Sequence, residues 1–102
     1  MAHKEFFRDV NDHSRLRVLV VTARGRVKRF TVQLEALLGE SWIPVARYDT
    51  AHGFAHLDIL HPNRAQDKVR IRAVDFNEAL ERAFTDLVKN AELYVTQYLE
   101  DL

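Results

Sequence analysis

The chain has 102 residues, of which 47% are hydrophobic and 29% charged, a balance typical of a soluble globular domain and unlike that of a disordered chain. It has no cysteine, which excludes disulfides, thiolate metal sites and a cysteine nucleophile. Fifteen Lys and Arg residues balance fifteen Asp and Glu residues, so the chain lacks the positive excess of a dedicated nucleic-acid-binding domain.

The sequence contains no apolar run that approaches the about 18 residues of a membrane-spanning helix. Its opening residues, MAHKEFFRDVND, also lack the apolar run of a signal peptide. We therefore expect one domain over residues 1–102, in the cytoplasm and without a membrane partner. Because a surface without net charge does little to keep copies apart, the charge balance favours a homodimer.

Residues 1–14 are mostly polar around the pair Phe6 and Phe7, and we expect them to form a loose N-terminal arm. Residues 15–63 then consist of β-branched or alternating segments separated by turns, which predicts an antiparallel sheet. The expected strands are Arg15–Arg24, Arg26–Leu38, Trp42–Asp49 and Phe54–Leu60. Since Pro44 has no N–H to donate, the third strand should have a free side or a bulge at that position.

Residues 64–74 allow two interpretations, a short fifth edge strand or an irregular crossover, because Val69 and Ile71 alternate with arginines. Asp75 then begins a helical pattern, with Glu78 three residues later as in a capping box. Apolar residues recur every three or four positions and no Gly or Pro follows, which predicts one long helix over residues 75–102. The expected fold class is α+β, a meander of four or five antiparallel strands with one C-terminal helix on one face.

One helix covers only one face of such a sheet, so the other face is expected to be open to solvent. Alternation along the strands assigns a set of polar side chains to this open face. The set consists of Thr31, Gln33, Glu35, His56 and Asp58, joined by Arg47 and Asp49 if Tyr48 points to the core. A register slip of one residue would exchange the two faces.

The stretch Arg47–Pro62, RYDTAHGFAHLDILHP, holds three of the five histidines of the chain and two aspartates, and it predicts a hairpin with a histidine-rich tip. A histidine beside a carboxylate can move protons near neutral pH, so candidate catalytic residues are His56, His52 and Asp49. The same side chains suit a divalent metal, with His52, His56 and Asp58 as candidate ligands. Candidate ligand-binding or nucleic-acid-binding residues are Arg47, Tyr48, Gly53 and Asp58.

Structural explanations compete with each of these assignments. His52 could cap a turn, and Asp49 before Thr50 could close an Asx-turn. Arg47 and Asp58 could form an ion pair that satisfies an open sheet face. Sheet faces also bind single-stranded nucleic acid when aromatic and basic side chains lie side by side, but no aromatic pattern typical of RNA-recognition motifs is visible.

The run Arg47–His56 together with Leu60–Pro62 resembles a small bacterial family of uncharacterised proteins with the pattern RYDTAHGFxH…LHP. The resemblance covers roughly residues 26–100 and implies one C-terminal helix but no known activity. More distantly, the hairpin is similar to that of TumE-type toxins of toxin–antitoxin pairs. The positions that match are Tyr48, Asp49, Gly53 and His56, with Thr50 in place of an asparagine.

Three functions follow as hypotheses. The first is a soluble binding domain, not an enzyme and without a cofactor, that self-associates through its open sheet face or its C-terminal helix. The second, implied by the resemblance, is a toxin-like ribonuclease that uses Asp49, His52 and His56 on RNA and has an antitoxin-like protein partner. The third is a protein that binds a divalent metal.

Overall fold

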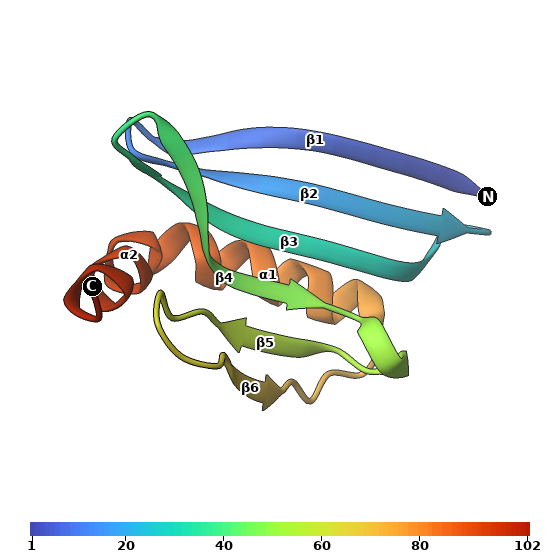
Figure 1. Cartoon of the computed structure of the whole chain (residues 1–102). Helices are drawn as coiled ribbons and strands as arrows, with labels where there is room; N and C mark the ends of the chain where they lie inside the picture. Colours follow the sequence, from blue (N-terminus) through green and yellow to red (C-terminus); the bar gives the residue numbers. More distant parts are fainter.

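The computed structural model describes all residues, 1–102, as an antiparallel sheet of six strands with two C-terminal helices (Figure 1). The strands are β1 (Ala2–Asn11), β2 (Ser14–Ala23), β3 (Arg26–Leu38), β4 (Ser41–Asp49), β5 (His56–Ile59) and β6 (Asp67–Arg70). The helices are α1 (Phe76–Lys89) and α2 (Ala91–Glu100), and a 3₁₀ turn, η1 (Ala51–Gly53), connects β4 to β5. Each strand pairs with its neighbour in sequence, so the sheet is a meander and the α+β class is confirmed.

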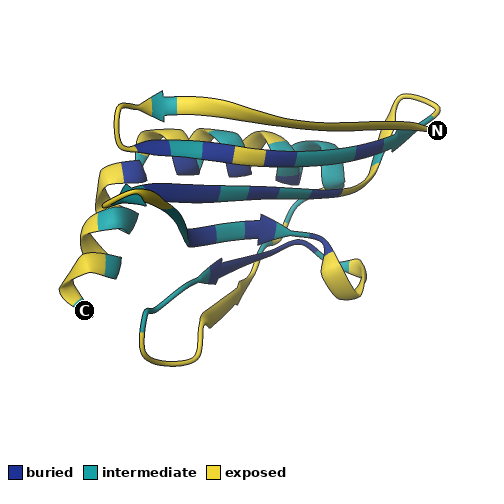
Figure 2. Ribbon diagram, turned by 45° about the horizontal axis from the view of Figure 1, so that its top comes forward, coloured by how far each residue is buried: buried dark blue, intermediate teal, exposed yellow.

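The N-terminal residues form a strand, so the prediction of a loose arm over residues 1–14 does not describe this segment. β1 pairs with β2 from Ala2 opposite Thr22 to Asn11 opposite Ser14. Almost every side chain of β1 is exposed, and Figure 2 shows this exposure along the strand. Because neither face of β1 is buried, its sequence carries no apolar alternation, and backbone pairing to β2 accounts for the strand.

At the other end of the sheet, the structure decides between the two interpretations of residues 64–74 in favour of a short edge strand. Part of the ambiguous segment 64–74 forms β6, which pairs with β5 from His56 opposite Arg70 to Ile59 opposite Asp67. All four residues of β6 are exposed, as is usual for a short charged edge strand.

The C-terminal helix is interrupted, so the prediction of one long helix over residues 75–102 is wrong. Asn90 leaves the helical conformation, with φ −108° and ψ 20°, between α1 and α2. Its side-chain amide donates to Oδ1 of Asp86 over 2.7 Å, a local bond of the kind by which asparagine competes with helix continuation. The predicted start is confirmed, since Oδ1 of Asp75 accepts the backbone N–H of Glu78 at 2.9 Å.

The core lies between the sheet and α1. Alternate residues of β2, β3 and β4 are fully buried against the helix, among them Leu16, Val18, Phe30, Val32, Leu34 and Ala46. From α1, Ala79, Ala83 and Leu87 face them, and the two alanines let the helix lie close to β3. Neither helix is long and apolar enough to cross a membrane.

Pro44 marks the bulge predicted for the third strand. The register of β3 and β4 shifts here, since Glu35 lies opposite Pro44 whereas Leu34 lies opposite Ala46. The extra residue, Val45, is buried. After the bulge, Ala46 and Tyr48 face the helix and Arg47 and Asp49 face the opposite side, as alternation predicted.

A group of polar side chains fastens the helices to the core side of the sheet. Asp86 of α1 accepts hydrogen bonds from the hydroxyl of Tyr48 at 2.6 Å and that of Tyr94 at 2.5 Å. Burial first, and then the hydrogen bond to Asp86, raise the pKa of both tyrosines above the ordinary value. Both hydroxyls therefore stay protonated near neutral pH and can donate to Asp86.

A second contact ties the β5–β6 loop to the end of α2. Nδ1 of His61 lies 2.8 Å from Asp101, and Nε2 lies 2.9 Å from Asp67. Hydrogen bonds, first to Asp67 and then to Asp101, raise the pKa of His61 above its usual value. The pKa of Asp67 is lowered, chiefly by the hydrogen bond to His61.

The His61 contact predicts a loss of stability at alkaline pH. A raised folded-state pKa means that the stabilisation is complete below the unfolded value of about 6.5 and is lost as pH rises through the folded pKa. The free energy of unfolding, measured with urea between pH 6 and 9, should therefore fall in wild type, and this fall should be smaller in His61→Gln. Identical pH profiles for the two proteins would contradict the prediction.

Candidate functional site

The register of β4, β5 and β6 brings charged side chains together on the sheet face opposite the helices, which we call the open face. Asp49 lies opposite His56, and Arg47 lies opposite Asp58. On β6, Arg70 continues the row of His56, and Lys68 continues the row of Asp58. Because directly opposite residues point to the same side of a sheet, two adjacent charged rows cross these three strands.

Three of these side chains meet at one point, the Asp49–His56–Asp58 cluster. Nε2 of His56 lies 2.7 Å from Oδ1 of Asp49 and 3.5 Å from Oδ2 of Asp58. One ligand atom from each residue lies within 4.8 Å of the others. The ammonium group of Lys68 borders the cluster, 3.5 Å from Nε2 of His56 and 3.7 Å from Oδ1 of Asp58.

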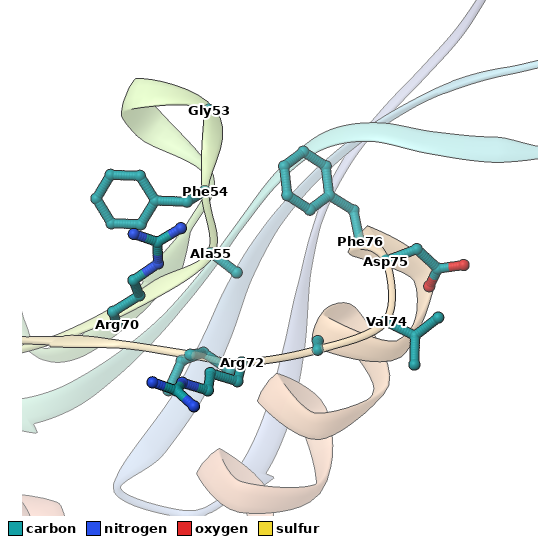
Figure 3. Close-up of a pocket in the computed structure, with 10 residues that line it drawn as sticks. Gly53, Phe54, Ala55, Arg70, Arg72, Val74, Asp75 and Phe76 are labelled. Carbon is teal, nitrogen blue, oxygen red and sulfur yellow. The ribbon is translucent and has the colours of Figure 1, made fainter.

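The cluster is buried although it belongs to the open face. His56 is 1% exposed and Asp58 is 2% exposed. Aromatic and long basic side chains provide the cover, since the ring of Phe54 lies 5.5 Å from the ring of His56, and the guanidinium of Arg70 lies 4.8 Å from the ring of Phe54. Figure 3 shows Arg70 turned toward the Phe54 ring. Within this buried cluster, Oδ1 of Asp58 has no hydrogen-bond partner.

Polar contacts continue from the cluster across the open face to the first strands. Arg47 donates from Nε to the side-chain oxygen of Gln33 at 2.8 Å, and the amide of Gln33 donates to Glu35 at 2.7 Å. Glu35 in turn accepts from Nε of Arg15 at 2.8 Å. The predicted pair of Arg47 with Asp58 is therefore present in register, but the guanidinium bonds to the neighbouring amide instead.

Asp49 is the accessible member of the cluster. Its side chain is 17% exposed, and its Oδ1 also accepts the backbone N–H of Ala51 at 3.0 Å, which is the predicted Asx-turn. A hollow of about 210 Å³ lies beside it on the open face, bordered among others by Arg29 and Thr31. A bound group could reach the Asp49 carboxylate from this hollow.

The structure separates three of the predicted site residues from the cluster. His52 lies in η1 with its side chain exposed and a positive φ of 67°, the conformation of a turn. Gly53 follows it with φ 84° and completes the turn without steric cost. Tyr48 faces the helices, where it bonds to Asp86. Of the predicted metal ligands, His56 and Asp58 come together, and Asp49 takes the place that His52 was expected to fill.

Lys68 and Arg70 were missing from the predicted site. Both belong to the ambiguous segment 64–74, and their place beside the cluster follows from the pairing of β6 with β5. The alternation of Lys68 and Arg70 with Val69 was the available signal, since it places both basic side chains on one face of an edge strand.

A larger hollow of about 490 Å³ lies on the other side of Phe54, between residues 53–55 and 70–76 (Figure 3). Its walls include Arg72, Val74 and Phe76. The guanidinium of Arg72 lies on the opposite side of the backbone from that of Arg70 in this view. Of the two arginines, only Arg70 stacks on the Phe54 ring beside the cluster.

The geometry permits two kinds of chemistry. A carboxylate held against an imidazole can accept a proton from a bound hydroxyl group. Two carboxylates and one imidazole that converge can also hold a divalent cation.

A family model described as a domain of unknown function, DUF7718, matches residues 1–102. No curated protein and no solved structure matches the chain.

Proposed function

The chain belongs to the DUF7718 family, a domain of unknown function, and we propose that it binds single-stranded RNA on its open face and cleaves it at the Asp49–His56–Asp58 cluster. The observation that carries the proposal is the convergence of these three side chains beside Lys68 and Arg70. An acid–base centre next to basic groups suits a phosphodiester, whose charged oxygens need cations and whose cleavage needs proton transfer.

Basic groups that could hold phosphates are available although the net charge is zero. Arg17, Arg29, Lys68 and Arg70 lie on the open face and are exposed. Arg17 and Arg29 make no side-chain hydrogen bond or ion pair within the chain. Much of the negative charge of this face, by contrast, is already engaged, since Glu35 bonds to Arg15 and Asp49 contacts His56. Two exposed carboxylates of the same face, Glu5 and Asp9 of β1, remain beside the free cations Arg17, Arg29 and Arg70. The free positive charges outnumber them by one, which favours an anionic ligand.

Aromatic rings next to arginines supply surfaces on which bases stack. Phe54 lies under Arg70 beside the cluster. At the far side of the open face, the guanidinium of Arg15 lies 4.0 Å from the ring of Phe7 and 4.2 Å from that of Trp42. Phe7 is 56% exposed, so it offers a ring at a second position along the face.

The proposed reaction is a transfer within the RNA strand. The Asp49 carboxylate takes the proton of a ribose 2′-hydroxyl, and the resulting oxygen attacks the adjacent phosphorus. The bond from phosphorus to the 5′ oxygen breaks, and that oxygen takes a proton from the Lys68 ammonium. The products are a 2′,3′-cyclic phosphate and a 5′-hydroxyl end. His56, which is too buried to meet substrate, positions Asp49.

Binding is tested by comparing two arginines that are two residues apart. Arg70→Ala should weaken the affinity for a fluorescent single-stranded RNA about tenfold, since it removes a phosphate contact and a stacking partner of Phe54. Arg72→Ala removes the same charge from a residue that does not stack on Phe54 and should leave the affinity nearly unchanged. Fluorescence anisotropy at fixed salt gives both values. Equal losses in the two variants, or no saturable binding by wild type, would refute the RNA proposal.

Self-association and the toxin-like assignment are more specific predictions, and each is supported by fewer observations than RNA binding. A homodimer has two surfaces available, the unpaired edge of β1 and the exposed Leu93, Leu99 and Leu102 of the C-terminal part. The open face suits it poorly, because burying charged rows against a second copy costs desolvation. The resemblance to TumE-type toxins supports RNA as the substrate and an antitoxin-like protein as partner only through Tyr48, Asp49, Gly53 and His56.

A further inference from the structure

The geometry points to a divalent-cation site formed by Asp49, His56 and Asp58, with the ammonium of Lys68 at its border, next to His56 and Asp58. This inference goes beyond the RNA proposal, in which Lys68 stays beside the cluster and no metal ion takes part. It replaces His52, the ligand expected from sequence, with Asp49.

The distances suit a cation after small side-chain adjustments. Ligand atoms about 2.1 Å from a metal and at right angles to each other lie about 3 Å apart. Here Nε2 of His56 lies 2.7 Å from one carboxylate oxygen and 3.5 Å from the other. All three ligand atoms lie within 4.8 Å of one another. One imidazole and two carboxylates form a set of ligands typical of Mn²⁺, Fe²⁺ and Zn²⁺.

The independent observation is the unpaired oxygen of Asp58. This carboxylate is 2% exposed, and its Oδ1 accepts no hydrogen bond. Such a buried anionic oxygen is costly unless a cation or donor meets it. Arg47, opposite Asp58 in the sheet, bonds to Gln33 instead. The charge of Lys68 stays 3.7 Å away, too far for a hydrogen bond.

The side chain of Lys68 can move away from the cluster without disturbing the fold. Its side chain is 42% exposed and lies on an edge strand, so the ammonium can swing into water. Lys68 brings one positive charge near the Asp58 carboxylate, whereas a divalent cation held by all three ligands would bring two positive charges to both carboxylates. Cation and ammonium then exclude each other, and removal of the lysine should strengthen cation binding.

Calorimetric titration of the full chain with Mn²⁺ near neutral pH tests this site without RNA. Wild type should bind one ion per chain, and Asp58→Asn should lose at least about tenfold in affinity. Lys68→Ala should gain several-fold, a direction that a purely structural lysine would not produce. His52→Ala is the matched control and should bind as wild type does.

Asp49→Asn serves as a second ligand variant because its side chain is partly exposed, and it should also weaken binding if Asp58→Asn does not fold. Absence of saturable Mn²⁺ binding in both wild type and Lys68→Ala would overturn the site. Unchanged binding in both folded aspartate variants would place the ion elsewhere and overturn it equally. RNA cleavage in the presence of a chelator would leave the RNA proposal standing whatever the metal result.

Discussion

Asp49→Asn is expected to slow RNA cleavage by at least about 100-fold, the typical contribution of a positioned proton acceptor. Asparagine keeps the shape of the side chain and an oxygen that can accept the N–H of Ala51. It cannot take the proton of the ribose hydroxyl. The folded state and RNA affinity should therefore survive while the rate falls. Single-turnover cleavage of a labelled RNA, with anisotropy for affinity, separates the two quantities.

His52→Ala is the control for this variant. Sequence alone made His52 an equal candidate for catalysis, but its side chain lies in the exposed turn and outside the cluster. It should cleave RNA at the wild-type rate. A loss in His52→Ala equal to that in Asp49→Asn would mean that the hairpin tip carries the chemistry. Full activity in Asp49→Asn would exclude Asp49 as the proton acceptor.

Asp86→Ala is expected to lower the free energy of unfolding by about 3 kcal/mol. The carboxylate accepts from Tyr48, Tyr94 and the side chain of Asn90, so its removal leaves the Tyr48 hydroxyl without a partner in a 6% exposed residue. The contact between α1, α2 and β4 weakens at the same time. Urea unfolding followed by circular dichroism gives the change directly.

Two further variants show whether loss of the Asp86 hydrogen bonds causes the loss of stability. Tyr48→Phe removes one donor but leaves the ring in the core, and it should cost only about 1 kcal/mol. Glu81→Ala removes an exposed carboxylate from the same helix and should change stability by less than about 0.5 kcal/mol. If Asp86→Ala were no more destabilising than Glu81→Ala, the polar group would not fasten the helices to the sheet.

Alternation and capping signals predicted the parts of the fold that bury one face. β3 and β5 alternate clearly, and the side chains assigned to each face of the sheet are found there. Asp75 caps α1 as its spacing with Glu78 indicated. These predictions hold because burial of one face selects the residue type at every second or fourth position.

The same signals are absent where burial is absent. β1 is exposed on both faces and carries no strand pattern, and in β6 the alternation of basic residues with Val69 was too short to distinguish an edge strand from an irregular crossover. The interruption at Asn90 depends on one side-chain bond to Asp86, which competes with helix propensity that continues on both sides. The number of strands and the break between α1 and α2 therefore depended on strand pairing and side-chain packing.

For the candidate site, the amino-acid sequence identified the stretch and its chemistry. Asp49, His56 and Asp58 were recognised as acid–base and metal-ligating groups, and alternation assigned them to the open face. Residue types and periodicity suffice for this, because both are local properties of the chain.

The partners of those groups depended on the register of strands that are distant in sequence. Pairing of Asp49 with His56 and of Arg47 with Asp58 brings three side chains together and leaves His52 in the turn. Pairing of β6 with β5 adds Lys68 and Arg70, and the ring of Phe54 then buries the cluster. A shift of one residue would have sent these side chains to the helix side, so the site exists only through contacts that no local pattern encodes.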